Sequence, residues 1–338
     1  MGVLRVGVLA YPRCFASEVY GVPDLLTMAT HLGGSDGIGY DVSIMSPRRQ
    51  VTASGGARLA VSAVRDVDVL VVPGFELSPG LLLDTTLAPL APELAVIRSH
   101  VATGNAVVSI CVGAFLLAEA GLLTGRRATT SWVFADELAR RCPDADVCAE
   151  ELVITDSGVT TTGSFSAMYD FALGLIREHS GTFVARATAR LALVDDARSS
   201  QTPYVDTRLL PRAGSEFSRE VMRHLDQNLG DRYDLTALAA TFRVSTRTLL
   251  RRFADETHQS PLDYLQASRV SRARHLLETT DRTIASISTT VGYKNPGTFA
   301  ALFTKHTGQP PSTYRTSFRR SDQSQRTSAS PGRTTPAS

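Results

Sequence analysis

The stretch LTALAATFRVSTRTLLRRFADET, residues 235–257, has the apolar spacing of two short helices joined by a turn. The first helix is expected at 236–241, and the turn follows it directly. Ser245 then opens the second helix as an N-cap, because its hydroxyl can accept a hydrogen bond from a free amide of the first turn. Leu249 and Phe253 lie four residues apart and anchor this helix to a core. The stretch therefore predicts a helix-turn-helix.

The free face of the second helix carries Arg247 and Arg251, which are also four residues apart. The planar guanidinium group of arginine can bond the O6 and N7 atoms of guanine at the same time. Two arginines on one isolated helix are more often simply solvated. We interpret this pair as base-reading because the whole pattern occurs twice.

The pattern returns some 50 residues later in RTIASISTTVGYKNPGTFAALFTKHTGQPP, residues 282–311. A short helix is expected at 284–291, and Gly292 supplies the turn. Phe299 and Phe303 then take the apolar positions of the second helix. A repeated unit of this kind favours DNA binding over a chance basic helix.

One long helix is expected between the two units, over 261–280. Its apolar residues share one side and its arginines lie elsewhere: Leu265, Val270, Ala273 and Leu276 against Arg269, Arg272 and Arg274. Such a helix can hold two recognition helices about 34 Å apart, one turn of DNA, so that both enter the major groove on one face.

Charge is distributed unevenly along the chain. Residues 1–214 hold 17 arginines and 22 acidic residues, a net charge of −5, whereas residues 215–320 hold 16 basic and 10 acidic residues, a net charge of +6. A basic C-terminal part fits attraction to phosphates, although a solvated basic surface would give the same count.

Apolar runs in the chain are strand-sized, so no membrane span is expected. The first residues lack a secretory signal, and a cytoplasmic location is expected. The four cysteines form neither a CxxC pair nor a zinc pattern, which argues against disulfides and a structural metal: Cys14, Cys111, Cys142 and Cys148. No cofactor is expected.

Strand-like and helix-like runs alternate through the first half of the chain. VDVLVVP (67–73) and AVVSIC (106–111) are nearly continuous apolar runs, typical of parallel strands covered on both faces. We expect a doubly wound α/β domain at 1–194 and a polar linker at 195–214. An all-α domain is expected at 215–320, followed at 321–338 by a disordered tail without large apolar residues.

Residues 235–315 strongly resemble the AraC family of transcription factors, above all in SPLDYLQASRVSRARHLL and VGYKNPGTFAALFTKHTGQPPSTYR. The resemblance implies binding of double-stranded DNA in the major groove. The family's base-contacting positions fall on Arg247, Leu250 and Arg251, and Ser245 and Thr246 begin the same helix.

The second recognition helix looks poorer in DNA-contacting side chains. Lys294, Asn295 and Thr298 are its candidate DNA contacts, and Ala301 stands where many family members carry a large polar or basic residue. We therefore expect the first helix to dominate sequence specificity, and the second helix mainly to contact phosphates.

Cys111 lies between a buried strand and a helix in VVSICVGAFLLAEAGLL, and Gly113 allows close packing of the turn. Such a turn is a nucleophile elbow. The thiol is expected to be exposed above the sheet, with a pKa lowered by the positive end of the helix dipole. A buried structural cysteine is the alternative.

Residues 4–180 resemble the PfpI and type 1 glutamine amidotransferase-like superfamily, which implies a flavodoxin-like fold and commonly a dimer. Enzymes of this superfamily place a histidine just after a Thr-Thr strand, and here that strand, expected at 128–132, holds Ser131 at the position. A hydroxyl cannot serve as a near-neutral base, so catalysis is not expected. Glu18 is the candidate acidic partner or an ordinary first-turn carboxylate, and the Gly74 amide could face the same pocket.

The order of the two domains matches regulators described as GlxA-like, and the linker, with Arg198 and Gln201, looks similar too. This resemblance implies that the first domain dimerises, can bind a small-molecule effector and biases DNA binding. A non-catalytic sensor is the leading hypothesis for this domain. A thiol hydrolase or glyoxalase-like enzyme, with His31 or His100 as base, and a redox sensor acting through Cys111 oxidation are the alternatives.

Overall fold

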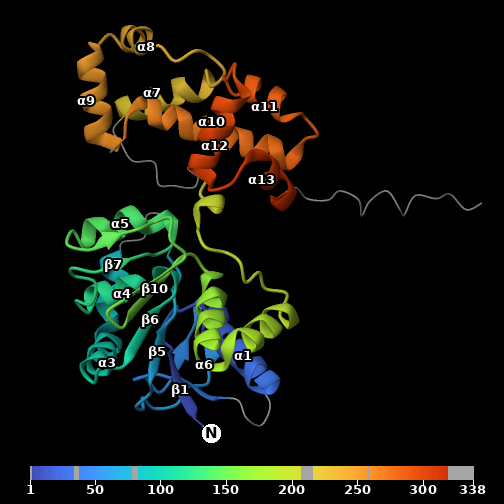
Figure 1. Cartoon of the computed structure of the whole chain (residues 1–338). Helices are drawn as coiled ribbons and strands as arrows, with labels where there is room; N and C mark the ends of the chain where they lie inside the picture. The colour runs from blue at the N-terminus through green and yellow to red at the C-terminus, as the bar shows by residue number, and fades with distance from the viewer. Residues whose placement is uncertain (1, 34–37, 78–82, 207–215, 258, 319–338) are drawn as a thin grey trace, which may run out of the picture. The chain divides into compact units, whose positions relative to one another are not determined.

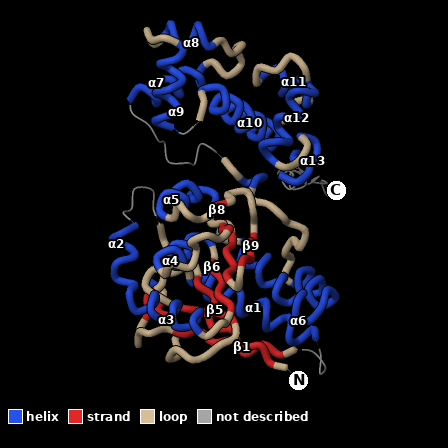
Figure 2. Tube along the Cα trace, turned by 60° about the vertical axis from the view of Figure 1, so that its left-hand side comes forward, coloured by secondary structure: helices blue, strands red, loops and turns tan. Residues whose placement is uncertain are grey.

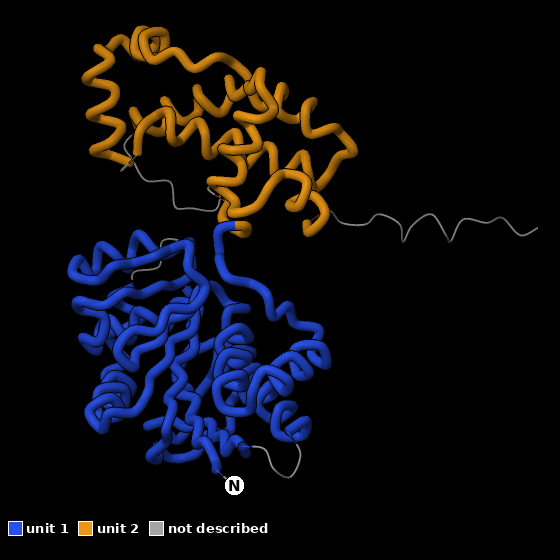
Figure 3. The backbone as a smooth tube through the Cα atoms, in the orientation of Figure 1, with its two compact units in different colours: residues 1–202 blue, residues 203–338 orange. Residues whose placement is uncertain are grey.

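The computed structural model describes residues 2–33, 38–77, 83–206, 216–257 and 259–318. They form two compact units, residues 1–202 and residues 203–338 (Figure 3). The expected tail at 321–338 and residues 207–214 of the expected linker lie outside the described residues. None of the described helices is long and apolar enough to cross a membrane.

Unit 1, residues 1–202, is built on a six-stranded sheet with the order β2-β1-β5-β6-β10-β9. Its strands are β1 (Val3–Leu9), β2 (Gly39–Met45), β5 (Val69–Val72), β6 (Ala106–Ser109), β9 (Val153–Asp156) and β10 (Val159–Thr162). All neighbours are parallel except β9, which pairs antiparallel with β10 at the edge. Every residue of β5 and β10 is buried, as expected of strands covered on both faces.

Helices cover both faces of this sheet. Helices α1 (Ala16–Gly33) and α6 (Ala167–Leu191) lie together on one side, and α3 (Ala91–Ala102) and α4 (Ala114–Glu119) lie on the other (Figure 1). Two further short helices, α2 (Leu83–Leu87) and α5 (Ala135–Arg141), also belong to the unit. The expected flavodoxin-like, doubly wound fold is confirmed.

Two small sheets lie outside the main sheet. Strand β3 (Val51–Thr52) pairs antiparallel with β4 (Arg58–Leu59), and β7 (Arg127–Ala128) pairs parallel with β8 (Asp146–Val147). The strand expected at 128–132 is therefore wrong beyond Ala128. Residues 129–131 are buried, but side chains and loops bond their backbone instead of a neighbouring strand.

Unit 2, residues 203–338, is all helical among its described residues. Its helices are α7 (Glu216–Gln227), α8 (Leu235–Thr241), α9 (Thr246–Thr257), α10 (Pro261–Thr279), α11 (Ile284–Thr290), α12 (Pro296–Thr307) and α13 (Pro311–Phe318). Figure 2 shows α10 as the long helix between the α8–α9 and α11–α12 pairs. Leu265 at its start joins one apolar core, and Val270, Ala273 and Leu277 join a second.

The segment at 195–202 belongs to unit 1, although it begins the segment expected to be the linker. Arg198 forms an ion pair with Asp170 of α6, and its Nη1 donates to the Ser166 hydroxyl at 2.9 Å. Gln201 is almost fully buried. We refer to residues 195–202 as the exit segment, because the chain passes from it into unit 2.

Candidate nucleic-acid interface and elbow pocket

The first helix-turn-helix consists of α8 and α9 with a three-residue turn. Asp234 caps α8, because its Oδ1 accepts from the amides of Thr236 and Ala237 at 2.9 and 3.0 Å. The Ser245 hydroxyl accepts from the Thr248 amide at 3.1 Å, the capping bond that the sequence predicts. Asp234 thus fixes the start of α8, and Ser245 marks the point where the turn ends and α9 begins.

One face of α9 is buried and the other is exposed. Leu249 and Phe253 are fully buried, whereas Arg247 and Arg251 are exposed and Leu250 is 37 % exposed. Arg251 makes a long 3.4 Å ion pair with Asp255, between side chains that are 67 % and 62 % exposed. Such an exposed pair contributes little, so the guanidinium group can exchange it for a base or a phosphate.

A neighbouring arginine of α9 has a packing role. Arg252 lies over the ring of Phe217 at 4.0 Å and forms an ion pair with Glu256 at 3.6 Å. The sequence does not separate this arginine from Arg251, because the distinction depends on the position of α7, to which Phe217 belongs.

The second helix-turn-helix repeats the frame of the first. Gly292 has φ 87°, so the tight turn before α12 requires glycine. Phe299 and Phe303 are fully buried, as their counterparts in α9 are. The exposed positions of α12 include Thr298 and Ala301.

The capping residue of α12 is also one of the candidate DNA contacts. Asn295 Oδ1 accepts from the amides of Gly297 and Thr298 at 2.7 and 3.3 Å. The side-chain oxygen of Asn295 is therefore already hydrogen-bonded within the helix, while Lys294 beside it is exposed. This leaves the face of α12 with fewer groups that could read a base than the face of α9.

The ends of the two recognition helices match at a spacing of 50 residues. Thr257 Oγ1 lies 2.6 Å from the Phe253 carbonyl oxygen, and Thr307 Oγ1 lies 2.8 Å from that of Phe303. Both hydroxyls also lie within hydrogen-bonding distance of a carbonyl two residues later, in Gln259 and Gln309. The duplication is therefore also present in detailed side-chain geometry.

Arg269 of α10 has a structural role instead of adding to a basic surface. It is 6 % exposed, its Nε donates to the Leu229 carbonyl at 2.8 Å, and it packs over Tyr293. The sequence places Arg269 away from the side that carries Leu265 and Val270, but it does not predict that this arginine is buried. The loop after α7 and the turn of the second helix-turn-helix enclose the Arg269 side chain.

In unit 1, Cys111 forms a tight elbow between β6 and α4. It has φ 53°, an uncommon value for a residue other than glycine. A Cβ at Gly113 would lie 2.5 and 2.6 Å from the carbonyl oxygens of Val72 and Pro73, so only glycine fits there. The strand-turn-helix elbow expected from the sequence is present.

The thiol of this elbow does not have the expected exposure or acidity. Cys111 is 8 % exposed, and burial, together with the nearby Glu18 carboxyl, raises its pKa to about 12. The prediction of an exposed thiol with a lowered pKa is therefore wrong. Helix α4 has only six residues, and its dipole does not outweigh the loss of solvent.

Glu18 faces the elbow from the start of α1. It is fully buried, its Oε2 accepts from the Gly74 amide at 2.5 Å, and burial raises its pKa to about 8. A Cβ at Gly74 would lie 3.1 Å from Glu18 Oε2 and 3.3 Å from Cys111 Cβ. The structure thus brings Cys111, Glu18 and Gly74 together.

Ser131 completes the elbow pocket. Its hydroxyl neighbours the Cys111 thiol and opposes the rise of the thiol's pKa, and it lies 3.0 Å from the Ser164 hydroxyl. His31 lies at the C-terminal end of α1, and His100 bonds the Ala106 carbonyl at the start of β6. Both histidines lie near the N-terminal ends of the parallel strands, whereas the elbow lies at their C-terminal ends, so neither supplies a base to the thiol.

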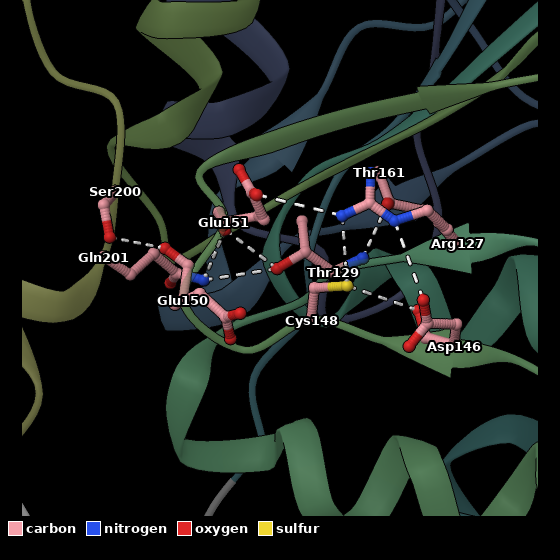
Figure 4. Close-up of polar contacts among 9 residues, drawn as sticks. All are labelled: Arg127, Thr129, Asp146, Cys148, Glu150, Glu151, Thr161, Ser200 and Gln201. Carbon is pink, nitrogen blue, oxygen red and sulfur yellow. Dashed lines mark hydrogen bonds and ion pairs between the residues drawn. The ribbon is translucent and has the colours of Figure 1, made fainter.

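Gln201 of the exit segment reaches this pocket through Ser164. Its Oε1 accepts from the Ser164 amide at 2.8 Å and lies 3.0 Å from the Ser164 hydroxyl. Its Nε2 lies 2.9 Å from the Thr130 carbonyl. The same nitrogen lies 3.0 Å from the Glu151 carbonyl, a contact drawn in Figure 4. The local sequence around Gln201 is polar and rich in turn-forming residues, so it gives no sign that this side chain is buried.

Both parts of the chain match known families. Residues 24–178 match the DJ-1/PfpI family, and residues 238–317 match a helix-turn-helix domain. The transcriptional regulator GbdR of Pseudomonas aeruginosa is 26% identical over 268 residues, which cover 78% of this chain and 71% of that protein. The transcriptional regulator GlxA of Rhizobium meliloti is 28% identical over 214 residues, covering 63% of this chain and 65% of GlxA.

This chain belongs to the AraC-type regulators that carry a DJ-1/PfpI domain before the helix-turn-helix domain. It is a DNA-binding transcriptional regulator. The chain is also similar to an enzyme, the isonitrile hydratase of Pseudomonas putida, with 28% identity over 247 residues that cover 64% of this chain and 98% of the enzyme.

Proposed function

We propose that this regulator reads its DNA target mainly with α9, while α12 holds the adjacent backbone. The observation that carries the proposal is the exposed side of α9, where Arg247, Leu250 and Arg251 lie opposite a fully buried apolar side. Arginine recognises guanine, and a leucine side chain can contact a thymine methyl group. Ser245 and Thr246 lie at the N-terminal end of this helix, where hydroxyls and amides suit a phosphate.

The exposed groups of the second helix-turn-helix, formed by α11 and α12, suit the DNA backbone. Lys294 offers a point charge, and Thr298 and the free amide nitrogen of Asn295 offer single hydrogen bonds. Such contacts position a protein on DNA without distinguishing bases. Selection of bound duplexes from a random pool tests the proposal. Arg251→Ala should relax the preferred sequence at one or two positions, whereas Lys294→Ala should keep the preferred sequence and weaken binding to all duplexes.

For unit 1 we propose a cytoplasmic, non-catalytic sensor that also forms the homodimer. The support is the elbow itself, where a buried thiol with a raised pKa has a hydroxyl and a carboxyl as neighbours, and no imidazole among the residues that the structure describes. A thiol in that state is a poor nucleophile at neutral pH.

The relative that is an isonitrile hydratase provides the substrate for the decisive assay. Full-length protein incubated with an isonitrile, and separately with methylglyoxal, should give no turnover above that of a Cys111→Ser variant. Turnover that disappears in this variant would show that unit 1 is an enzyme.

We propose further that unit 1 acts on unit 2 through Gln201. Ser131 neighbours the Cys111 thiol, and hydrogen bonds run from Ser131 through Ser164 to Gln201. The exit segment then continues into unit 2. Binding of a small-molecule effector at the elbow, or oxidation of Cys111, therefore alters the hydrogen bonds that hold the exit segment through Gln201.

DNA affinity of the full chain measures this coupling. Gln201→Ala should change the affinity by roughly 5- to 150-fold, the usual range of a coupling free energy between two sites. Ser199→Ala, an exposed position of the same segment, is the matched control and should leave the affinity unchanged. Equal affinities of wild type and Gln201→Ala, with unit 1 folded in both, would rule the connection out.

A further inference from the structure

Helix α6 is interrupted in its middle. Gly181 has φ 85° and ψ 164°, a backbone conformation that is essentially restricted to glycine. The two parts of α6 therefore run in different directions (Figure 1). The second part, 182–191, leads directly to the exit segment.

The interruption brings three arginines to one hollow. On a continuous helix, Arg177 and Arg186 would point in opposite directions, because nine residues turn the helix by about 900°. With the change of direction at Gly181, both line a hollow of about 480 Å³ together with Arg190. Its other lining residues are Thr182, Ala189, Val194, Asp196 and Ala197.

Positive charge in this hollow is largely uncompensated. Arg177, Arg186 and Arg190 are all exposed, and within the described residues no ion pair to any of them is found. Asp196 is the acidic residue of the lining, so the hollow has a net charge of +2. Residues 1–202 as a whole hold 15 arginines and 21 acidic residues, a net charge of −6.

We propose that this hollow, which we call the α6 hollow, binds a small organic oxyanion with two or more carboxylate or phosphate groups. Guanidinium groups bind both kinds of oxyanion through paired hydrogen bonds. The volume exceeds the need of an inorganic ion and matches the lower range of ligand pockets. The acidic unit around the hollow repels a DNA backbone at longer range, whereas a small anion enters the hollow itself.

The occupant of the α6 hollow is an effector, because one wall of the hollow is the exit segment. Asp196 and Ala197 line it, and Arg198, the next residue, is bonded to Asp170 of α6 and to Ser166, the residue before this helix. An anion held by arginines on both sides of Gly181 favours one arrangement of this segment over others. This regulatory part rests on the proposed function of unit 1.

Titration calorimetry on the full-length protein tests the site without DNA. Citrate and inorganic pyrophosphate are the carboxylate and phosphate probes, glycerol is the neutral control, and chloride keeps the ionic strength equal. We expect at least one anion to bind, with a Kd weakened by about tenfold or more in the double variant Arg186→Gln/Arg190→Gln. Arg58→Gln, an exposed arginine elsewhere in unit 1, is the matched control and should bind as wild type does.

Binding that is the same in the double variant and in wild type, or no binding of either anion at millimolar concentration, overturns the site. Binding of only one anion identifies the head group as carboxylate or phosphate. A double variant that binds DNA more weakly with no anion present, and with a lower salt dependence, would show that these arginines contact DNA, against the proposal.

DNA affinity measured with and without the bound anion tests the regulatory part. We expect a change in wild type and in Arg58→Gln, and none in the double variant. An anion that binds without changing the DNA affinity overturns the effector role but not the binding site. Failure of wild type to bind DNA both with and without the anion would instead contradict the function proposed for the chain.

Discussion

The elbow pocket of unit 1 and the exposed face of α9 in unit 2 treat ionisable side chains in opposite ways. At the elbow, Glu18 and Cys111 are buried, and burial raises the pKa of both groups. On α9, Arg251 is 67 % exposed and has one weak ion pair. The elbow therefore responds to protons and to what enters the pocket, whereas the α9 face responds to salt and to DNA.

The largest effect should come from Glu18→Gln. In the unfolded chain Glu18 loses its proton near pH 4.5, but in the folded protein only near pH 8. Between these values the folded state binds more protons, so stability is fully present at the lower pH and falls as the pH rises to about 8. The loss is on the order of 4 kcal/mol. Trp132, the one tryptophan of the chain, lies in unit 1 and reports its unfolding by fluorescence.

Glu18→Gln should remove most of this pH dependence and be more stable than wild type at pH 8. Asp24→Asn, further along α1 and exposed, is the control and should keep the wild-type profile. A wild-type stability that stays level from pH 5 to about 8 would mean that Glu18 is ionised in the folded protein, and the contrast with the α9 face would disappear.

A second prediction concerns the reactivity of Cys111. With its pKa raised to about 12, the thiol should react with iodoacetamide at pH 8 about a hundredfold more slowly in the folded protein than in urea. Cys148, which is only partly buried, is the internal control and should change much less. Labelling followed by mass spectrometry gives both rates, and fast labelling of folded Cys111 would support the redox-sensor alternative.

The third prediction compares the two recognition helices. Arg251→Ala should cost about 1–3 kcal/mol of binding to the preferred duplex and little to a random one, because it removes a base contact. Thr298→Ala should weaken binding to both duplexes by a similar small factor. Fluorescence anisotropy with the two duplexes measures each loss. Equal, sequence-selective losses in both variants would contradict the proposal that α9 reads bases while α12 mainly contacts phosphates.

The smallest expected effect is that of Lys294→Ala on salt dependence. One lost phosphate contact should reduce the slope of log Kd against log salt concentration by about 1. Asn295→Asp sharpens the test, because aspartate keeps the cap of α12 but adds a negative charge beside the phosphates. Binding should weaken in that variant while the helix content is unchanged. An unchanged salt slope in Lys294→Ala would remove this lysine from the interface.

Local patterns were sufficient for the helix-turn-helix units and for most of the sheet. The apolar runs expected to be strands at 67–73 and 106–111 contain β5 and β6, and Ser245 caps α9 as predicted. N-caps, apolar pairs four residues apart and turn glycines depend on neighbours within a few residues, so the sequence shows them directly. The strand expected at 128–132 shows the limit of such patterns, because pairing requires a partner from a distant part of the chain.

The sequence by itself determined the fold class, the duplicated reading unit and the glycine elbow that holds Cys111. Only the tertiary structure decided how buried Cys111 and Glu18 are, that Gln201 is bonded to the elbow pocket, and that Arg177 and Arg186 line one hollow. The physical reason is that exposure and pKa depend on all groups around a side chain, and here those groups come from segments far apart in the sequence.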